Sequence, residues 1–183
     1  MGFNGAAVKF HPSKHWVAMV VKKEIAVAFL FDTHNFQSTE QPATTSKINQ
    51  DINDFSWCSK LHDSLILGAE DGTVFLWNVN SSNPIKRFKE HISRITSVDF
   101  NPTDDTFITA SWDKTVRLWN VGEENCKRVH EHADCVSSAK WNPHEKSKHA
   151  SKSFDGILHF WDVNGNVVTQ TIHADDSPII SLG

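Results

Sequence analysis

The sequence predicts an all-β protein built from one repeated unit of about four short strands. A fixed spacing is the first reason: Asp71, Asp113 and Asp155 lie 42 residues apart, and three tryptophans keep the same interval. A period of this length is typical of repeat architectures. The composition is the second reason, because 7 of the 183 residues are Trp and none is Tyr. The third reason is that apolar, β-branched and aromatic runs alternate with turn residues, which favours strands over helices.

Each unit is expected to contain four strands, named a to d in chain order. The Asp-Gly pairs at 71–72 and 155–156 stand between strand-like runs and predict a tight turn between strands b and c. The Asn-Pro pairs at 101–102 and 142–143 follow the runs that are expected to form strand a. The predicted units span residues 4–49, 52–89, 94–130 and 135–172, and a fifth begins at 178.

A Trp-Asn or Trp-Asp pair closes strand c of three units, at 77–78, 119–120 and 161–162. Four strands in about 42 residues with such a close are typical of the blade of a WD-repeat β-propeller. The predicted fold is therefore an all-β, WD-repeat β-propeller with about four complete four-stranded blades and the start of a fifth, which together form an open arc.

Composition and charge narrow the classes of function. The 18 basic and 22 acidic residues give a net charge of −4, whereas a nucleic-acid-binding surface would show as a basic excess. We expect neither a transmembrane segment nor a secretory leader, because no run has the required apolar pattern. The three cysteines follow no regular pattern and are expected to be reduced thiols. We expect no catalytic residue and no cofactor, since no phosphate-binding loop, carboxylate pair or nucleophile motif is visible.

Two predicted blades carry polar residues with matched spacing. In each set a carboxylate, an imidazole, a hydroxyl and an indole N–H are expected to form one buried chain of hydrogen bonds that holds the blade together. The two sets are His91, Ser111, Asp113 and Trp119, and His132, Ser153, Asp155 and Trp161. The second blade keeps only Asp71 and Trp77.

These sets also contain the residue types of a hydrolase triad. That interpretation is disfavoured because the same residues recur in register and the indole engages the hydroxyl. A zinc site at the His-Glu-His run 130–132 is disfavoured because His132 already belongs to its blade, so no metal is expected.

Several segments resemble the family of receptors for the type 2 peroxisomal targeting signal. Glu stands before His at 90–91 and 131–132, where generic WD repeats have Gly. The segments that carry the resemblance are 3–10, 83–91, 131–136, 139–144, 160–163, 172–174 and 179–181. They keep the family's order along the whole chain and are strongest from about residue 54 onward.

The resemblance implies a non-enzymatic import receptor. Such a receptor binds a short N-terminal helical signal with a basic first residue, aliphatic positions and a His or Gln. It acts with a co-receptor and delivers cargo to docking proteins at the peroxisomal membrane. The chain is then expected to be cytoplasmic and to shuttle to the peroxisomal membrane and matrix, without nucleic-acid binding or membrane insertion. The family's propeller has seven blades, so the chain is expected to be an arc truncated from a larger propeller.

A propeller presents its d–a and b–c loops on one rim, and an apolar face with nearby acidic groups suits recognition of a basic amphipathic helix. The residues predicted to form this peptide-binding rim are Glu70, Trp112, Phe154, Arg94, Asp134 and Cys135. Packing of Trp112 and Phe154 between blades is an equally open interpretation.

Two other classes of function stay open at this point. The chain could serve as a WD-repeat scaffold or adaptor in a multiprotein assembly of the ubiquitin-ligase or chromatin type. It could also be a truncated product without function.

Overall fold

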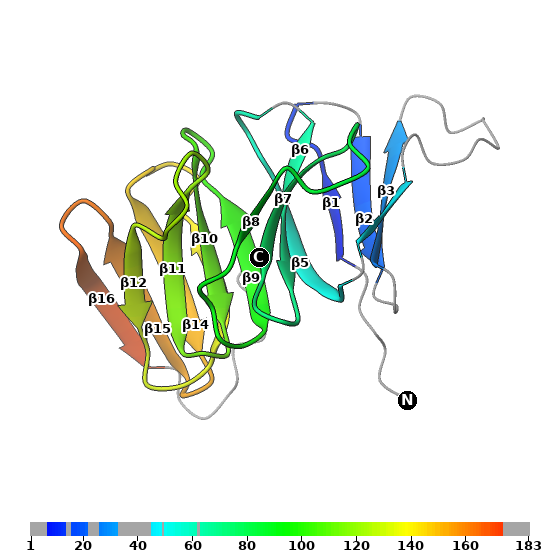
Figure 1. Cartoon of the computed structure of the whole chain (residues 1–183). Helices are drawn as coiled ribbons and strands as arrows, with labels where there is room; N and C mark the ends of the chain where they lie inside the picture. The colour runs from blue at the N-terminus through cyan, green and yellow to red at the C-terminus, as the bar shows by residue number, and fades with distance from the viewer. Residues whose placement is uncertain are drawn as a thin grey trace.

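The computed structural model describes residues 7–13, 16–21, 26–32, 45–48, 50–61 and 63–173. Within these ranges the chain forms strands and no helix, and the strands make up four-stranded antiparallel sheets. The sheets follow one another along an arc in chain order (Figure 1). The all-β prediction is therefore confirmed, and the fold is an open, partial β-propeller.

The sheets share one topology, in which strands are ordered as in the chain and neighbours run antiparallel. The first sheet contains β1 (Ala7–Phe10), β2 (Trp16–Val21), β3 (Ala26–Asp32) and β4 (Thr45–Ile48). The second contains β5 (Ile52–Trp57), β6 (Ser64–Ala69), β7 (Val74–Asn78) and β8 (Lys86–Phe88). The third contains β9 (Ile95–Phe100), β10 (Thr106–Ser111), β11 (Thr115–Asn120) and β12 (Arg128–Glu131). The fourth contains β13 (Val136–Trp141), β14 (Lys148–Ser153), β15 (Ile157–Asp162) and β16 (Val167–His173).

Some of the sequence-based expectations concern residues that the structure does not describe. The fifth unit expected from residue 178 lies outside the described residues, as do parts of the first predicted blade.

Tight turns join the second and third strands of the last three sheets. Gly72 and Gly156 have φ angles of 82° and 79°, a left-handed conformation that glycine adopts without steric cost. Lys114 takes the equivalent place in the third sheet with a φ of 69°. These turns bring the residue that precedes each turn Asp to the same end of its sheet.

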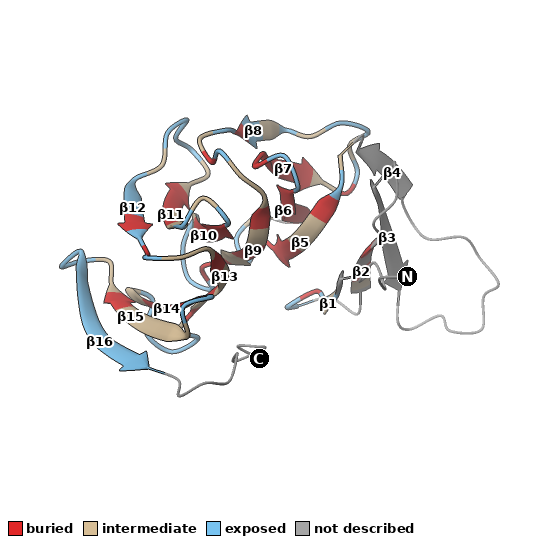
Figure 2. Ribbon diagram, turned by 90° about the horizontal axis from the view of Figure 1, so that it is seen from below, coloured by how far each residue is buried: buried red, intermediate tan, exposed pale blue. Residues whose placement is uncertain are grey.

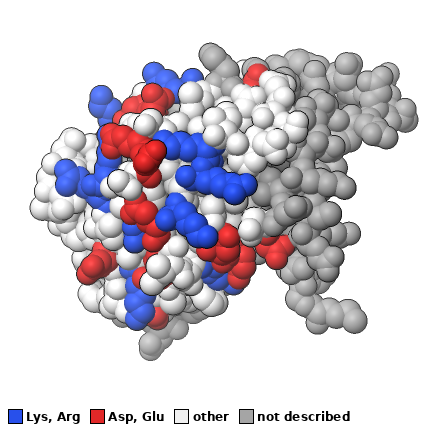
Figure 3. Space-filling view, in the orientation of Figure 1, with Lys and Arg blue, Asp and Glu red and all other residues white. Residues whose placement is uncertain are grey.

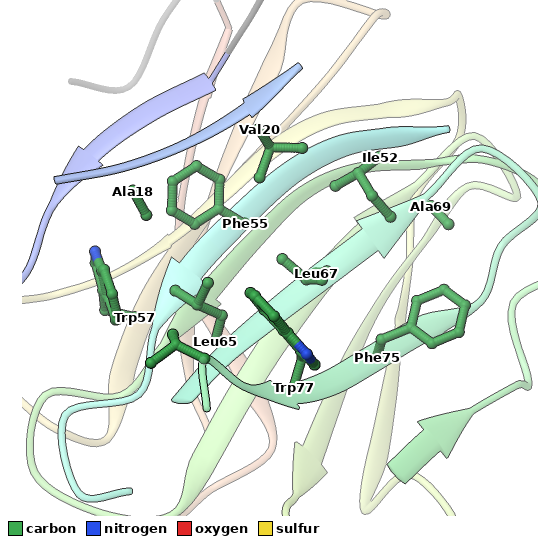
Figure 4. Close-up of a cluster of buried hydrophobic side chains, with 11 residues drawn as sticks. Ala18, Val20, Ile52, Phe55, Trp57, Leu65, Leu67, Ala69, Phe75 and Trp77 are labelled. Atoms are coloured by element: carbon green, nitrogen blue, oxygen red, sulfur yellow. The ribbon is translucent and has the colours of Figure 1, made fainter. Parts of the chain in front are cut away.

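Apolar side chains between neighbouring sheets form the core. Figure 4 shows the first of these seams, where Ala18 and Val20 of β2 lie beside Phe55 and Leu67 of the second sheet. In the next seam, Ile66 and other apolar residues of the second sheet pack against β9. Figure 2 shows that burial is concentrated where sheets face one another, whereas β16 is exposed along its whole length. Each described sheet is thus stabilised mainly by its neighbour.

The first strands of the sheets are also linked by charged groups. Lys9 Nζ lies 2.8 Å from Asp54 Oδ1, and Asp54 Oδ2 accepts a hydrogen bond from Val98 N at 2.9 Å. One sheet further on, Asp99 Oδ2 accepts from Trp141 N at 2.8 Å, and Asp99 Oδ1 lies 3.4 Å from Lys140 Nζ. Burial lowers the pKa of Lys9 and raises the pKa of Asp99. These charged side chains therefore join the first strand of each sheet to the first strand of the next, through ion pairs and through hydrogen bonds to backbone N–H groups.

Gly68 of β6 marks the closest approach between the second and third sheets. A Cβ atom at this position would lie 2.5 Å from Ile95 Cγ2 and 2.9 Å from Val98 Cγ1. Glycine inside a strand often marks such a contact. We expect Gly68→Ala to lower the free energy of unfolding by ~1–3 kcal/mol, because an overpacked core must shift.

Gly122→Ala is the matched control, since its nearest neighbour would be the Asn120 Oδ1 atom at 3.2 Å. Urea unfolding of the two variants measures the difference. Equal losses would contradict the assigned contact.

Candidate functional site

The candidate site is the rim formed by the turns between the second and third strands and by the loops that enter each sheet. One backbone hydrogen bond ties these two loops together in each of the last three sheets. The bonds are Glu70 N to Asp51 O at 2.8 Å, Trp112 N to Arg94 O at 3.1 Å, and Phe154 N to Cys135 O at 2.9 Å. The repeat thus places equivalent residues at equivalent points of one edge.

Two aromatic side chains from neighbouring sheets meet on this rim. Trp112 and Phe154 are in edge-to-face contact with ring centroids 6.3 Å apart. They nevertheless stay 42% and 59% exposed. Their mutual contact bridges two blades, and their exposure leaves apolar surface for a ligand.

A cation and a carboxylate extend the aromatic pair toward the second sheet. The Arg94 guanidinium lies 4.4 Å from the centre of the Trp112 ring, a cation–π contact. Arg94 Nη1 is 3.5 Å from Glu70 Oε1, and Asn53 Nδ2 donates to Glu70 Oε2 at 2.7 Å. Four of the six predicted rim residues therefore form one line, which we call the rim line: Glu70, Arg94, Trp112 and Phe154.

The two remaining predicted residues lie in the loop between β12 and β13. The Cys135 thiol donates to Trp112 O at 3.2 Å, which attaches it to the rim line. Asp134 Oδ1 accepts from Cys135 N at 2.8 Å and caps its own loop. Sequence reasoning missed Ile92, which is 90% exposed in the loop before β9. The sequence did contain a signal for it, because an apolar residue directly after His91 lies in the loop that enters the third sheet.

A chain of hydrogen bonds anchors the rim of the third sheet. Trp119 Nε1–H donates to Thr109 Oγ1 at 2.9 Å, and the Thr109 hydroxyl donates to His91 Nε2 at 2.7 Å. His91 Nδ1–H donates to Asp113 Oδ2 at 2.6 Å. Burial alone would raise the pKa of Asp113, but the hydrogen bond and charge of His91 hold that pKa well below its usual range.

The sequence-based prediction that Ser111 supplies the hydroxyl of this hydrogen-bond chain is wrong. Thr109 takes that place. It pairs with Arg117 of β11, two residues before Trp119, so its hydroxyl lies within hydrogen-bond distance of the Trp119 indole. Ser111 comes two residues later, beyond a shift in the pairing of β10 with β9. Its hydroxyl serves the turn instead, donating to Ser93 O at 3.0 Å and accepting from Asp113 N at 3.1 Å.

The fourth sheet repeats the correction and adds another. Ser151, not Ser153, accepts from Trp161 Nε1 at 2.8 Å and contacts His132 Nε2 at 2.7 Å. Asp155 was expected to bind the imidazole, but it accepts from the Ser153 hydroxyl.

His132 Nδ1–H instead donates to a backbone acceptor, His130 O, at 3.2 Å. In the second sheet, Trp77 Nε1 donates to Ser81 O, and Asp71 Oδ1 accepts from Thr73 N. Only the third sheet therefore joins all four kinds of group, among the described residues.

The described residues lack the features of two other kinds of site. No group of three or more His, Cys, Asp or Glu side chains among them is placed to hold a metal ion. None of these residues forms a helix long and apolar enough to cross a membrane. On the face shown in Figure 3, side chains of both charges are interspersed. Thr109 is fully buried, so its hydroxyl is a structural group and not an accessible nucleophile.

Residues 82–120 match the family model described as WD domain, G-beta repeat. This region begins before β8 and ends with β11, and it contains the complete hydrogen-bond chain of the third sheet. The match therefore identifies a WD repeat in this part of the chain, within the open, partial β-propeller that the sheets form.

Several of the similar proteins carry peroxisomal names, and two are described here. The chain is 36% identical over 128 residues to "Peroxisome biogenesis protein 7" of Arabidopsis thaliana, which covers 64% of this chain and 40% of the relative. It is 33% identical over 101 residues to "Peroxisomal targeting signal 2 receptor" of Homo sapiens, which covers 52% and 31%. A relative of another kind, "Transcriptional corepressor LEUNIG_HOMOLOG" of Arabidopsis thaliana, is 29% identical over 115 residues, covering 61% and 15%. The chain thus spans less than half the length of these curated relatives.

The contact between Asp113 and His91 can be isolated by comparing two aspartates. Asp113 Oδ1 and Asp104 Oδ1 each accept from the backbone N–H and the hydroxyl of the threonine two residues later. Only Asp113 also binds a buried imidazole. We expect Asp113→Ala to lower the free energy of unfolding by ~1–3 kcal/mol more than Asp104→Ala, because His91 Nδ1–H is left without its acceptor.

Denaturant unfolding at pH 7.5 measures both variants. If their midpoints shift by the same amount, the hydrogen-bond chain does not stabilise the third sheet.

Proposed function

We propose that this chain is the peptide-binding part of a non-enzymatic receptor for the type 2 peroxisomal targeting signal. The observation that carries the proposal is the rim line, because it puts exposed aromatic rings, a cation and a carboxylate in one row across three sheets. The similarity to two proteins with peroxisomal names supports the choice of ligand.

The chemistry of the rim line suits a basic, amphipathic helix. Trp112 and Phe154 offer an apolar platform of the kind that accepts one face of a helix. Glu70 lies at the other end, and the side chains of Asp51 and Asp71 beside it are exposed. A basic residue of the ligand would bind this acidic end while its aliphatic residues cover the aromatic pair.

The partners and cellular route follow from the same proposal. A receptor of this kind binds cargo in the cytoplasm, acts with a co-receptor and reaches docking proteins at the peroxisomal membrane. Neither nucleic-acid binding nor membrane insertion is part of the proposal.

A WD-repeat scaffold is the second candidate. The match to a transcriptional corepressor over 61% of the chain favours it. In a scaffold, the rim line would bind a partner protein that lacks the type 2 signal.

The proposal predicts that two rim variants bind a type 2 signal peptide more weakly. Trp112→Ala removes the platform, and Glu70→Lys reverses the charge at the acidic end. We expect each to weaken binding by ~1–3 kcal/mol in calorimetry with the full chain, as anchors at interfaces do.

Ile85→Ala and Glu124→Lys are the matched controls, since both residues are exposed on loops between the third and fourth strands, away from the rim. They should bind like the parent chain. No binding by the parent, or equal binding by all variants and a scrambled peptide, would favour the scaffold.

A further inference from the structure

Aromatic rings close the seam between the second and third sheets. Phe88 of β8 packs edge-on against Phe107 and Trp119, with ring centroids 5.1 Å and 5.6 Å apart. All three side chains are almost fully buried. No group in this trio can take up a proton.

The next seam has three rings at the equivalent repeat positions, but they differ in chemistry and are stacked. His130 of β12 stacks on His149 and Trp161 of the fourth sheet, with centroids 5.1 Å and 4.1 Å apart. His130 and His149 each stand 42 residues after the corresponding Phe of the preceding seam. The repeat has therefore exchanged a pair of phenyl rings for a pair of imidazoles at a buried contact.

The hydrogen bonds of this pair are satisfied when both imidazoles are neutral. His130 Nε2–H donates to Asn166 Oδ1 at 3.3 Å, so His130 Nδ1 accepts from His149 Nε2–H at 3.1 Å. A proton on His130 Nδ1 would point at the N–H group of His149 Nε2, so the hydrogen bond between the two rings would be lost. His149 Nδ1 is buried and has no hydrogen-bond partner among the described residues, and only the backbone of Ala150 raises the pKa of His149. Because His130 and His149 are only 3% and 1% exposed, water cannot replace the lost partners.

The surrounding titratable groups give little compensation. Arg128 acts on His130, and His132 acts on His149, each lowering the pKa of its neighbour. Asp155 raises the pKa of His132 and of His159, whereas His173 lowers the pKa of His159. Lys140 and the Glu145–Lys148 ion pair line the same cavity as His149.

Burial is the main cause that lowers the pKa of four histidines here: His130, His149, His132 and His159. It takes the pKa of His149 to about 3 and that of His132 to about 4. Below pH ~6.5 these histidines therefore bind more protons in the unfolded chain than in the folded chain. Their contribution to the free energy of unfolding is therefore complete above this pH and is lost as the pH decreases below it.

We propose that the seam between the third and fourth sheets is an acid-sensitive joint, in which proton uptake by His130 and His149 opens the seam while the Phe-lined seam stays closed. The loop from β12 to β13, which carries Cys135, belongs to this joint. Opening it would therefore disturb the rim line beside Phe154. That last consequence rests on the proposed function, whereas the joint itself does not.

Urea unfolding of the full chain at pH 7.5 and 5.5 tests the joint without any ligand. His149 alone should reduce the folding equilibrium constant about tenfold between these two pH values. The double variant His130→Phe/His149→Phe copies the Phe88/Phe107 pair and should lose at least about tenfold less. His144→Gln removes an exposed histidine and should behave like the parent chain. Parallel losses in the parent and the double variant would overturn the proposal.

Hydrogen exchange of the unmodified chain provides a second test that needs no variant. After correction for intrinsic rates, peptides from β12 and β14 should lose protection at pH 5.5 before peptides from β8 and β10. Simultaneous loss, or earlier loss at β8 and β10, would also overturn the proposal.

Discussion

Mutual covering of sheet faces is the constraint on which the rest of this structure depends. A single four-stranded sheet cannot bury its apolar residues alone, and in repeat proteins each unit is stabilised by contact with its neighbours. Here the outer strand of one sheet inserts an aromatic ring against the next sheet, as Phe88 does against Phe107 and Trp119. Because these seams fix the spacing of the sheets, the turns that carry Trp112 and Phe154 come within contact distance.

The hydrogen-bond chain of the third sheet connects this packing to the rim. It begins at Trp119 in the buried seam and ends at Asp113 in the turn next to Trp112. The fourth sheet keeps the indole, hydroxyl and imidazole but ends on a backbone carbonyl, so His132 has no hydrogen-bonded carboxylate to support a charge. The same repeat therefore combines a firmly anchored turn with a neighbour that responds to acid.

The sequence was sufficient for the all-β fold and the tight turns, because period, alternation and Asp-Gly pairs are local signals. It was not sufficient for the buried hydroxyl, since Ser111 and Thr109 lie on the same face of β10 and only the shift in pairing separates their roles. The rim residues could be named from their repeat positions, but not the contacts of Arg94 with Trp112 and Glu70, which join different sheets. The paired imidazoles were missed because their chemistry depends on the neighbouring sheet.

Mapping the ligand on the chain by NMR tests the central claim most directly. The measurement is the change in amide chemical shifts when a type 2 signal peptide is added to the isotopically labelled full chain. The account predicts the largest changes along the rim, at residues 70–73, 92–94, 112–114 and 154–156. Changes confined to the loops at the opposite end of the sheets, at 101–105 and 142–147, would contradict it.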